Sequence, residues 1–300
     1  MVVLLVLVVV VDGFLVTRRV PTVALEAAGS QDGTTYLIAA SDSRDRLGAE
    51  DRERYADRNQ PHGERADLVL LLHRDAEGRS TLYSLPRDLY VGQRRGSPHR
   101  LGLALQDGPQ SLVDSLCQDL GVGVDHVLVV DMAALVSLVD IAGGVTVRVA
   151  RPTRDVRAEL DLPTAGEQHL DGHGALAWVR SRSPQVLADG QWVPDRAADP
   201  TRTSHAKEVL SQLVRRLDDP LTIQRAAWAV GPRLRRDDGL GTTGLVRLAR
   251  SLQDALDDGS EVTVPARVRG TSVPFAFVTP ETTRALQPLV SEGCVSASRR

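Results

Sequence analysis

The stretch ADLVLLLH, residues 66–73, constrains the fold of this chain more than any other segment. It is apolar on both faces of an extended strand, and such a strand is stable only inside a sheet that is covered on both sides. Strand-like and helix-like segments alternate around it along the 300 residues. We therefore expect a single-domain α/β fold, in which a mixed central β-sheet is sandwiched between α-helices.

Hydrophobic periodicity predicts the other elements. The segments TTYLIAAS (34–41) and STLYSLPRD (80–88) have the composition of strands, and Pro86 should end the second one. The charged, turn-rich residues 42–65 form a long loop, and loops of this length are usually functional or disordered. Further strands are expected at 125–131, 145–150 and 261–268, and helices at 109–121, 132–144, 203–217, 221–235, 243–257 and from about residue 281.

The N-terminal run is apolar over residues 2–11 and resumes as FLV after a break that contains Asp12. A membrane span needs about 20 apolar residues, so this run is short and carries a charge. Arg18 and Arg19 follow it, and the positive-inside rule taken literally would place the body of the protein in the cytoplasm. We expect instead a membrane anchor or signal whose basic N-terminal segment is cut off from the start of this sequence, with a buried core strand as the alternative.

These features predict the organisation of the chain. A hydrophobic anchor is followed by a linker that contains Pro21, by one folded domain and by a short flexible tail. The expected bounds are 1–17 for the anchor, 18–33 for the linker, 34–290 for the domain and 291–300 for the tail.

Composition narrows the choice of partners. The net charge of −3 argues against a protein that binds nucleic acid over a whole face, and 3% aromatic residues leave little for base stacking. The seven histidines lack HExxH-type spacing, so they are expected to be structural or on the surface. Cys117 and Cys294 fit neither a metal knuckle nor a disulfide-dense scaffold, and they form one bridge or none.

Charged residues mark the ends of three expected strands. Asp42 follows the first strand, and Arg87 and Asp88 end the third. Arg65 and Asp67 flank the residue at which the second strand begins, and a period of two points both side chains the same way. A salt bridge would explain the pair. The other interpretation places a cation on the aspartate and a phosphate oxygen on the arginine, which partly fits the ligand-binding edge of open α/β sheets.

The stretch VRSR, residues 179–182, places two arginines after the apolar run GALAWV. On a continuous helix Arg180 and Arg182 would project about 200° apart and could not face one ligand. Pro184 disfavours helical geometry at the residue before it, so the helix should end near Arg180 and leave Arg182 able to turn to the same side. The structural alternative is that both arginines pair with acidic neighbours such as Asp189 or Asp195.

Four stretches resemble, in order and spacing, the successive motifs of the LytR-CpsA-Psr family. The resemblance runs from about Thr34 to Leu217, with a weaker echo in SVPFAFVTPETTRAL. It implies a mixed sheet between helices and a single-pass membrane protein whose domain faces outward. It also implies a phosphotransferase that moves a glycopolymer from a polyprenyl-pyrophosphate carrier to peptidoglycan, with the polyprenyl tail in an apolar pocket. The four stretches are LIAASDSR, ERADLVLLLHRDAEGRSTLYSLPRDLYV, GVGVDHVLVVDMAALVSLVDIAGGVTVRV and AGEQHLDGHGALAWVRSRS.

The resemblance also implies roles for single residues. Asp42 and Asp67 match carboxylates that hold Mg²⁺ or Mn²⁺, and Asp88 is a candidate for metal or base. Arg100 stands in for a lysine of the family and Arg202 begins a further helix, so both are candidates for substrate binding. The residues that match the pyrophosphate-binding arginines are Arg65, Arg87, Arg180 and Arg182.

Gly102 and Ala206 stand where the family has amides, which keeps a second interpretation open. That alternative is a non-catalytic or weakly hydrolytic protein of the cell envelope that binds polyprenyl pyrophosphate. A regulatory protein that binds nucleic acid or a partner is a third, and the net charge argues against it. The near-exclusive use of arginine, with Lys207 as the one lysine, suggests a high-GC actinobacterial source.

Electrostatics gives a physical argument beside the resemblance. Two like charges 4 Å apart repel by about 1 kcal/mol in water and about 4 kcal/mol at an effective dielectric near 20. Four arginines that converge therefore require a polyanion, and pyrophosphate offers the oxygens that guanidinium forks bind. Mg²⁺ typically binds one or two carboxylates together with phosphate oxygens, so two aspartates suffice.

Overall fold

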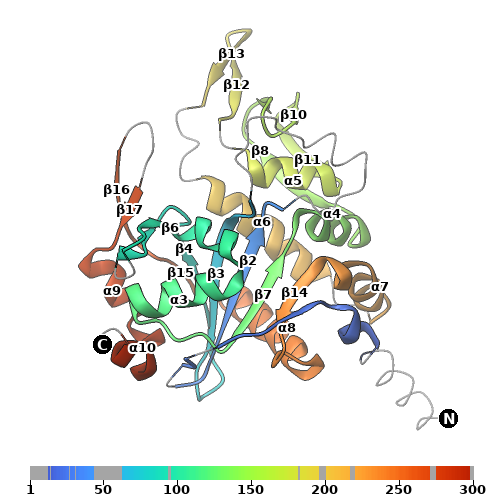
Figure 1. The fold of residues 1–300 in the computed structure, drawn as a ribbon. Coiled ribbons are helices and arrows are strands. Elements are labelled where there is room, and N and C mark those ends of the chain that lie inside the picture. The colour runs from blue at the N-terminus through green and yellow to red at the C-terminus, as the bar shows by residue number, and fades with distance from the viewer. Residues whose placement is uncertain are drawn as a thin grey trace, which may run out of the picture. The chain divides into compact units, whose positions relative to one another are not determined.

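The contacts of the chain divide it into two compact units (Figure 1). The first comprises Met1–Met132 and Gly231–Arg300, and the second comprises Ala133–Val230. Each unit has a hydrophobic core of its own. The structure is a computed structural model that describes residues 13, 15–26, 28–30, 32–43, 63–93, 96–181, 183–195, 201–216, 220–270 and 275–297.

The first unit is built on a mixed sheet, as the sequence predicts. In the described part of the chain this sheet has seven strands in the order β1-β14-β7-β2-β3-β4-β15. Strand β3, the apolar segment of the opening prediction, pairs antiparallel with β2 on one side and β4 on the other, and β2 pairs parallel with β7. The bounds are β1 Thr22–Val23, β2 Thr34–Ser41, β3 Ala66–Arg74, β4 Ser80–Leu85, β7 His126–Val130, β14 Leu234–Asp237 and β15 Glu261–Thr263.

Helices cover both faces of this sheet. Leu37 and Leu71 are paired in register and fully buried in one core with η2 (Leu101–Asp107) and α3 (Pro109–Leu120). Their neighbours Tyr36 and Leu72, which point to the opposite face, are buried as well. Helix α8 (Thr242–Asp257) packs against β3 and β4. The expected sandwich of a mixed sheet between helices is therefore confirmed.

Two of the expected elements near the C-terminal end are wrong. The helix expected at 221–235 ends early, because Gly231 and Pro232 interrupt it, and α7 spans Pro220–Val230. The next residues form β14, which pairs antiparallel with β7. The Asp237 carboxylate fixes this strand by accepting from the Val127 N–H at 2.8 Å. The strand expected at 261–268 is split by Pro265 into β15 and β16 (Arg267–Arg269).

Short elements complete the first unit. Near the sheet lie two hairpins, β5–β6 and β16–β17, and the C-terminal part is helical. Their bounds are β5 Tyr90–Val91, β6 His99–Arg100, β17 Phe275–Phe277, η3 Gly231–Arg233, α9 Pro280–Leu286, η4 Gln287–Leu289 and α10 Glu292–Ala297.

The second unit joins two small antiparallel sheets to four helices in its described part. One sheet has the order β10-β9-β12-β13, and the other pairs β11 with β8. Helix α6 packs on α5 and β8, and Val209 and Leu213 bring its buried side into the core. The bounds are α4 Met132–Ile141, β8 Val145–Val149, β9 Thr153–Asp155, β10 Leu160–Leu162, β11 Gly166–Leu170, α5 Gly172–Arg180, β12 Gln185–Ala188, β13 Gln191–Pro194 and α6 Thr201–Arg216.

The segment expected as a linker at 18–33 belongs in part to the fold. Residues 15–19 are helical, Val20 is buried, and β1 adds to the sheet beside β14. The buried Arg236 guanidinium holds this segment by donating to the carbonyls of Thr17 and Leu240 at 3.5 and 2.9 Å. The apolar run at 2–11 lies outside the described residues. Among the residues that the structure does describe, no helix combines the length and the apolar character that a bilayer span requires.

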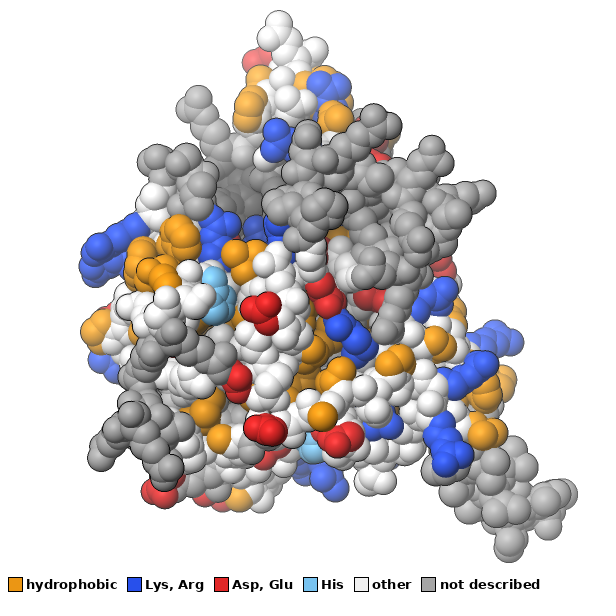
Figure 2. Space-filling view, viewed as in Figure 1, with side chains coloured by type: hydrophobic (Ala, Val, Ile, Leu, Met, Phe, Trp, Pro, Cys, Tyr) orange, Lys and Arg blue, Asp and Glu red, His pale blue; other side chains and the backbone are white. Residues whose placement is uncertain are grey.

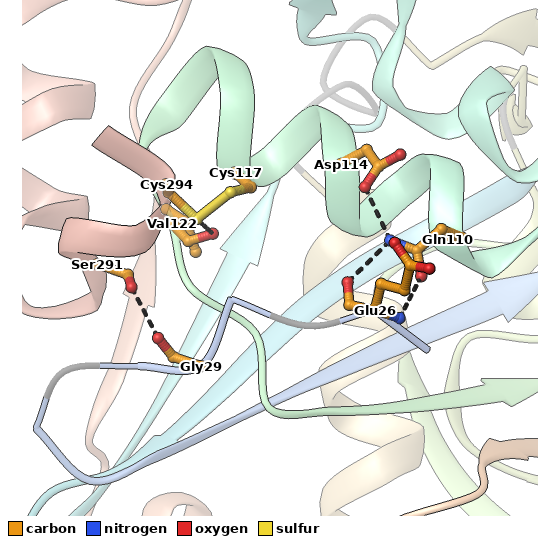
Figure 3. Close-up of a disulfide and its surroundings, with 8 residues drawn as sticks. All are labelled: Glu26, Gly29, Gln110, Asp114, Cys117, Val122, Ser291 and Cys294. Atoms are coloured by element: carbon orange, nitrogen blue, oxygen red, sulfur yellow. Dashed lines mark hydrogen bonds between the residues drawn. A yellow bond between two sulfur atoms is a disulfide. The ribbon is translucent and has the colours of Figure 1, made fainter. Parts of the chain in front are cut away.

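A disulfide answers the question that the two cysteines left open (Figure 3). It joins Cys117 of α3 to Cys294 of α10, and Cys294 is fully buried. Beside it the Ser291 hydroxyl donates to the Gly29 carbonyl at 2.7 Å. The expected flexible tail is therefore wrong for residues 291–297, because the crosslink and this contact fasten α10 to the domain.

The disulfide should contribute strongly to stability. It closes a loop across a sequence separation of 177 residues, and a long loop loses much entropy when its ends are joined. We expect the double variant Cys117→Ala/Cys294→Ala to lower the free energy of unfolding by about 2–5 kcal/mol in urea denaturation. Dithiothreitol should destabilise the unaltered chain and leave the variant unchanged. Equal stability of the two proteins under oxidising conditions would contradict this role.

Candidate functional site

Three strand ends meet at one end of the central sheet. Strand β2 ends at Ser41, which pairs with Ala66 at the start of β3, and Leu85 at the end of β4 pairs with Val69. The antiparallel register therefore brings together the residues that the sequence analysis placed at these ends. Asp42, Arg65, Asp67, Arg87 and Asp88 all belong to this end of the sheet.

Backbone contacts fix the first two of these residues. The Asp42 N–H donates to the Arg65 carbonyl at 2.9 Å, and the Arg65 N–H donates to Asp42 Oδ1 at 2.7 Å. The Asp42 carboxylate is thus held against the start of β3. Most of the expected 42–65 loop lies outside the described residues.

Four charged side chains form a continuous row across the strand ends, which we call the ion-pair row. Arg87 hydrogen-bonds Asp67 through its Nη1 atom, and its Nε lies 3.6 Å from Asp88 Oδ2. Arg100 Nη1 lies 3.6 Å from Asp88 Oδ1. All four side chains are 20–29% exposed, so solvent reaches the row and screens it in part.

Two arginines keep donor capacity at this site. The Nε atoms of Arg65 and Arg87 are buried, and neither has a hydrogen-bond acceptor among the described residues. A buried donor without an acceptor is costly, and such groups in a folded protein call for an explanation. An anion that enters the site and accepts from these N–H groups would remove the cost.

Glu64 and Arg235 were not singled out from the sequence. The Glu64 carboxylate accepts from the Ser41 hydroxyl and pairs with the Arg235 guanidinium of β14. These contacts fasten the end of the 42–65 loop to the sheet beside Asp42 and Arg65. Arg235 was missed because its segment was expected to be helical. Arg235 and Asp237 are two positions apart, a spacing that places both side chains on the same face of a strand.

The repulsion argument of the sequence analysis does not hold for Arg87, the arginine of the four that pairs with a carboxylate in the first unit. Arg87, Arg100 and Arg235 each lie against a carboxylate, those of Asp67, Asp88 and Glu64 respectively. Their charges are therefore balanced within the protein. What favours an anion here is the pair of buried Nε donors of Arg65 and Arg87, because the charges of Arg87, Arg100 and Arg235 already lie against carboxylates.

Gly102 allows a very close approach at the ion-pair row. Its N–H donates to the Arg87 carbonyl at 2.7 Å. A Cβ atom at this position would lie 2.5 Å from the Ala66 carbonyl oxygen and 3.3 Å from Arg87 Cβ. No side chain fits here unless the backbone shifts. The glycine that replaces a family amide therefore has a packing role of its own in this chain.

The second unit carries the remaining predicted arginines. Helix α5 ends at Arg180 and Ser181 is extended, which confirms the predicted helix end. The buried Asp155 carboxylate accepts from the Ser181 hydroxyl and from the Ser183 N–H, both at 2.9 Å. Asp155 was missed from the sequence. It fixes the backbone on both sides of Arg182, a residue that itself lies outside the described residues.

The start of α6 packs against the end of α5 through an aromatic contact. His205 stacks on Trp178 with ring centroids 3.8 Å apart, and its Nδ1 lies 3.3 Å from the Trp178 carbonyl. Burial lowers the pKa of His205, so the ring is neutral at pH 7. The expected structural role of this histidine is confirmed. Arg202 lies in the first turn of α6, and its side chain lies outside the described residues.

The candidate metal ligands Asp42 and Asp67 suit Mg²⁺ in their chemistry. Both are carboxylates at the same strand ends, and Mg²⁺ commonly takes one or two carboxylates with phosphate oxygens and water. Among the described residues no cluster of three or more histidine, cysteine, aspartate or glutamate side chains could hold a metal. A Mg²⁺ ion at this site would therefore depend on oxygens from a ligand.

Comparison with known proteins identifies the family. The model of the LytR_cpsA_psr family matches residues 16–271. The chain therefore belongs to the LytR-CpsA-Psr family, as its motifs predicted.

Curated relatives match about half of the chain. It is 34% identical over 167 residues to a probable cell wall biosynthesis protein, LcpB, of Corynebacterium glutamicum. It is 25% identical over 171 residues to TagV of Bacillus subtilis, named a polyisoprenyl-teichoic acid–peptidoglycan teichoic acid transferase. These matches cover 55% and 54% of this chain and 40% and 41% of the two relatives. The chain thus spans about two fifths of the length of these relatives.

Solved structures share the fold. A LytR-Csp2A-Psr enzyme from Actinomyces oris superposes with a TM-score of 0.74 at 28% identity and covers 92% of this chain and 97% of that one. TagT bound to LI-WTA gives a TM-score of 0.58 at 18% identity, over 89% and 99% of the two chains. The second likeness supports the fold alone.

The close approach at Gly102 can be tested by substitution. We expect Gly102→Ala to lower the free energy of unfolding by about 1–3 kcal/mol, because the added methyl group meets backbone atoms of β3. The matched control is Gly241→Ala, since a Cβ there meets nothing within 4 Å and the backbone is extended. Chemical denaturation of the three proteins measures the difference. Equal effects of the two substitutions would show that Gly102 has no special packing role.

Proposed function

We propose that this chain is a cell-wall phosphotransferase that moves a glycopolymer from a polyprenyl-pyrophosphate carrier to peptidoglycan. The observation that carries the proposal is the ion-pair row of Asp67, Arg87, Asp88 and Arg100 at the sheet end. It combines guanidinium forks, carboxylates for a cation and a carboxylate suited to accept a proton. Membership of the LytR-CpsA-Psr family and a relative named as a teichoic acid transferase support the same reaction class.

The arginines would bind the pyrophosphate. Arg65 and Arg87 hold buried Nε donors at the strand ends, and a guanidinium fork matches phosphate oxygens in a geometry that lysine cannot reproduce. The family resemblance adds Arg180, Arg182 and Arg202 of the second unit, and this addition stays a prediction. In phosphoryl transfer the protein mainly positions groups and stabilises developing charge, which several arginines can do.

The pairing of Arg87 with Asp67 suggests why a metal and a pyrophosphate would bind together. Each side chain now neutralises the other. A pyrophosphate alone would attract Arg87 and leave Asp67 without its cation, whereas a divalent cation alone would do the reverse. Mg²⁺ held by Asp42 and Asp67 would supply positive charge against the phosphate oxygens. Binding of Mg²⁺ and pyrophosphate together would thus replace the ion pair between Arg87 and Asp67. Arg87 would then contact the phosphate oxygens, and Asp67 would contact the metal.

Asp88 is the group proposed to take the proton. Arg87 and Arg100 lie on either side of its carboxylate at 3.6 Å, so the candidate base is held in place beside the arginines proposed to bind the pyrophosphate. The hydroxyl oxygen of the acceptor sugar would form a bond to the phosphorus that carries the glycopolymer. The bond from that phosphorus to the polyprenyl phosphate would break, and the hydroxyl proton would pass to Asp88.

A second function remains open because of one observation at Gly102. The family amide is absent there, and the packing leaves no room for a side chain. The chain would then bind polyprenyl pyrophosphate, or hydrolyse it weakly, without transfer to an acceptor. A turnover assay with an acceptor glycan separates the two functions, since transfer forms a phosphodiester on the glycan and hydrolysis does not.

We also propose that the folded domain lies outside the cytoplasm and is tethered by the N-terminal apolar run. The disulfide between Cys117 and Cys294 supports this location, because disulfides persist in oxidising compartments. Protease added to intact protoplasts should therefore digest the domain. Complete protection, with digestion only after lysis, would contradict the proposed location.

The arginine clamp predicts that lysine cannot replace arginine. Arg87→Lys, Arg180→Lys and Arg182→Lys should each weaken binding of a polyprenyl pyrophosphate by about 1–3 kcal/mol, the range for charged hydrogen bonds. Arg79→Lys is the control, because Arg79 is 77% exposed and pairs with Asp75 at a surface turn. Titration calorimetry measures affinity, and thermal melting on the same variants separates binding from stability. Unchanged affinity with a lowered melting temperature would indicate that these arginines are structural.

If Mg²⁺ replaces Arg87 as the partner of Asp67, Mg²⁺ and pyrophosphate should bind cooperatively. The affinity for Mg²⁺ should rise when a polyprenyl pyrophosphate is present, because the lipid releases Asp67 from Arg87 and adds phosphate oxygens. Asp67→Asn should abolish most of this rise, whereas Asp75→Asn at the surface turn should leave it intact. Calorimetric titration with and without lipid tests this. Equal Mg²⁺ affinity in both titrations would contradict a shared site.

A further inference from the structure

An aromatic cluster lies beside the ion-pair row. Tyr90 of β5 makes contacts with Phe275 and Phe277 of β17 at ring-centroid distances of 5.4 and 5.3 Å. All three rings are half-buried, and they include two of the three phenylalanines in the chain. A chain with 3% aromatic residues thus gathers three of them at one partly exposed place.

Arg100 joins this cluster to the proposed site. Its guanidinium lies 5.0 Å from the centroid of the Phe275 ring, and its Nη1 lies 3.6 Å from Asp88 Oδ1. The backbone makes a second connection, because the Ala276 N–H donates to the Asp88 carbonyl at 2.9 Å. The cluster therefore adjoins Asp88 directly, beyond the Asp67–Arg87 pair.

A second arginine lies near an aromatic ring at the outer end of the cluster. Arg269 of β16 lies 5.7 Å from the centroid of the Phe277 ring, and both Arg269 and Val268 are exposed. Figure 2 shows hydrophobic and basic side chains gathered on the left of this face, where Figure 1 places β16 and β17. Arg100, Phe275, Tyr90, Phe277 and Arg269 thus form a continuous surface, which we call the aromatic row.

We infer that the aromatic row binds the saccharide chain of the acceptor and leads its hydroxyl group to Asp88. The C–H faces of pyranose rings pack on aromatic side chains, and their hydroxyl and acetamido oxygens accept hydrogen bonds from guanidinium groups. The row alternates these two kinds of group. An acceptor hydroxyl must reach Asp88 if that carboxylate is to take its proton, and the aromatic row adjoins Asp88. The inference rests on the proposed function for the role of Asp88.

Binding of a defined saccharide tests the inference. The probe is chitotetraose, a soluble chain of β-1,4-linked N-acetylglucosamine, titrated into the full chain by calorimetry. We expect Phe277→Ala to weaken binding about tenfold and Phe277→Tyr to retain it. Arg269→Gln, which leaves the rings in place, should weaken binding about threefold. The matched control is Trp192→Ala, which removes another ring that an arginine covers, with Arg154 at 4.4 Å.

A parallel titration with geranylgeranyl pyrophosphate separates this inference from the proposed function. Phe277→Ala should keep pyrophosphate binding, whereas Arg87→Ala should lose it and keep chitotetraose binding. Binding of pyrophosphate without binding of chitotetraose would overturn the inference and leave the proposed function intact. Saccharide binding that depends on the row, in a chain that does not bind pyrophosphate, would support the saccharide surface and refute the proposed function.

Three other outcomes would overturn the inference. Equal losses in Phe277→Ala and Trp192→Ala would show that the effect is not specific to the row. A lowered melting temperature in Phe277→Ala with unchanged saccharide affinity would show that the rings only pack the β16–β17 hairpin. Unchanged saccharide affinity with weaker association to phosphatidylglycerol vesicles would show that the row contacts membrane lipid.

Discussion

The ion pair between Arg87 and Asp67 joins two strand ends, and the arrangement of the proposed site depends on it. Asp67 is held by β3 and Arg87 follows β4, so the pair forms only because these strands are antiparallel neighbours. The close packing at Gly102 helps to hold Arg87 in position, since the Gly102 N–H donates to the Arg87 carbonyl. Asp88 and Arg100 then continue the row toward the aromatic side chains.

Balanced charge distinguishes this site from a simple basic patch. Arg87, Arg100 and Arg235 each lie against a carboxylate, so these three arginines do not need an anion to balance their charge. A ligand that carries both kinds of charge, such as a metal–pyrophosphate complex, can exchange with these pairs without leaving a buried charge alone. This account explains why acidic and basic residues lie side by side at the strand ends of this chain.

The sequence was sufficient for the parts of the fold that local pattern controls. The continuous apolar character of 66–73 identified a central strand, and Pro184 identified the end of α5 at Arg180. Long-range partners could not be predicted. Strand β14 exists because β7 offers it an edge, which its own residues do not reveal. Residues distant in sequence determine the roles of Glu64, Arg235 and Asp155. The spacing of the two cysteines could not decide whether they pair, and the structure shows that they form a disulfide.

Mass spectrometry of lipid that co-purifies with the membrane-extracted chain tests the central claim most directly. The account predicts a polyprenyl pyrophosphate with or without attached sugars on the unaltered protein, and its loss from Arg87→Ala. The control Arg79→Ala, at a surface turn, should retain the lipid. Lipid of the same kind and amount on Arg87→Ala, or none on a folded unaltered chain supplied with such lipid, would contradict the claim that this sheet end holds a carrier pyrophosphate.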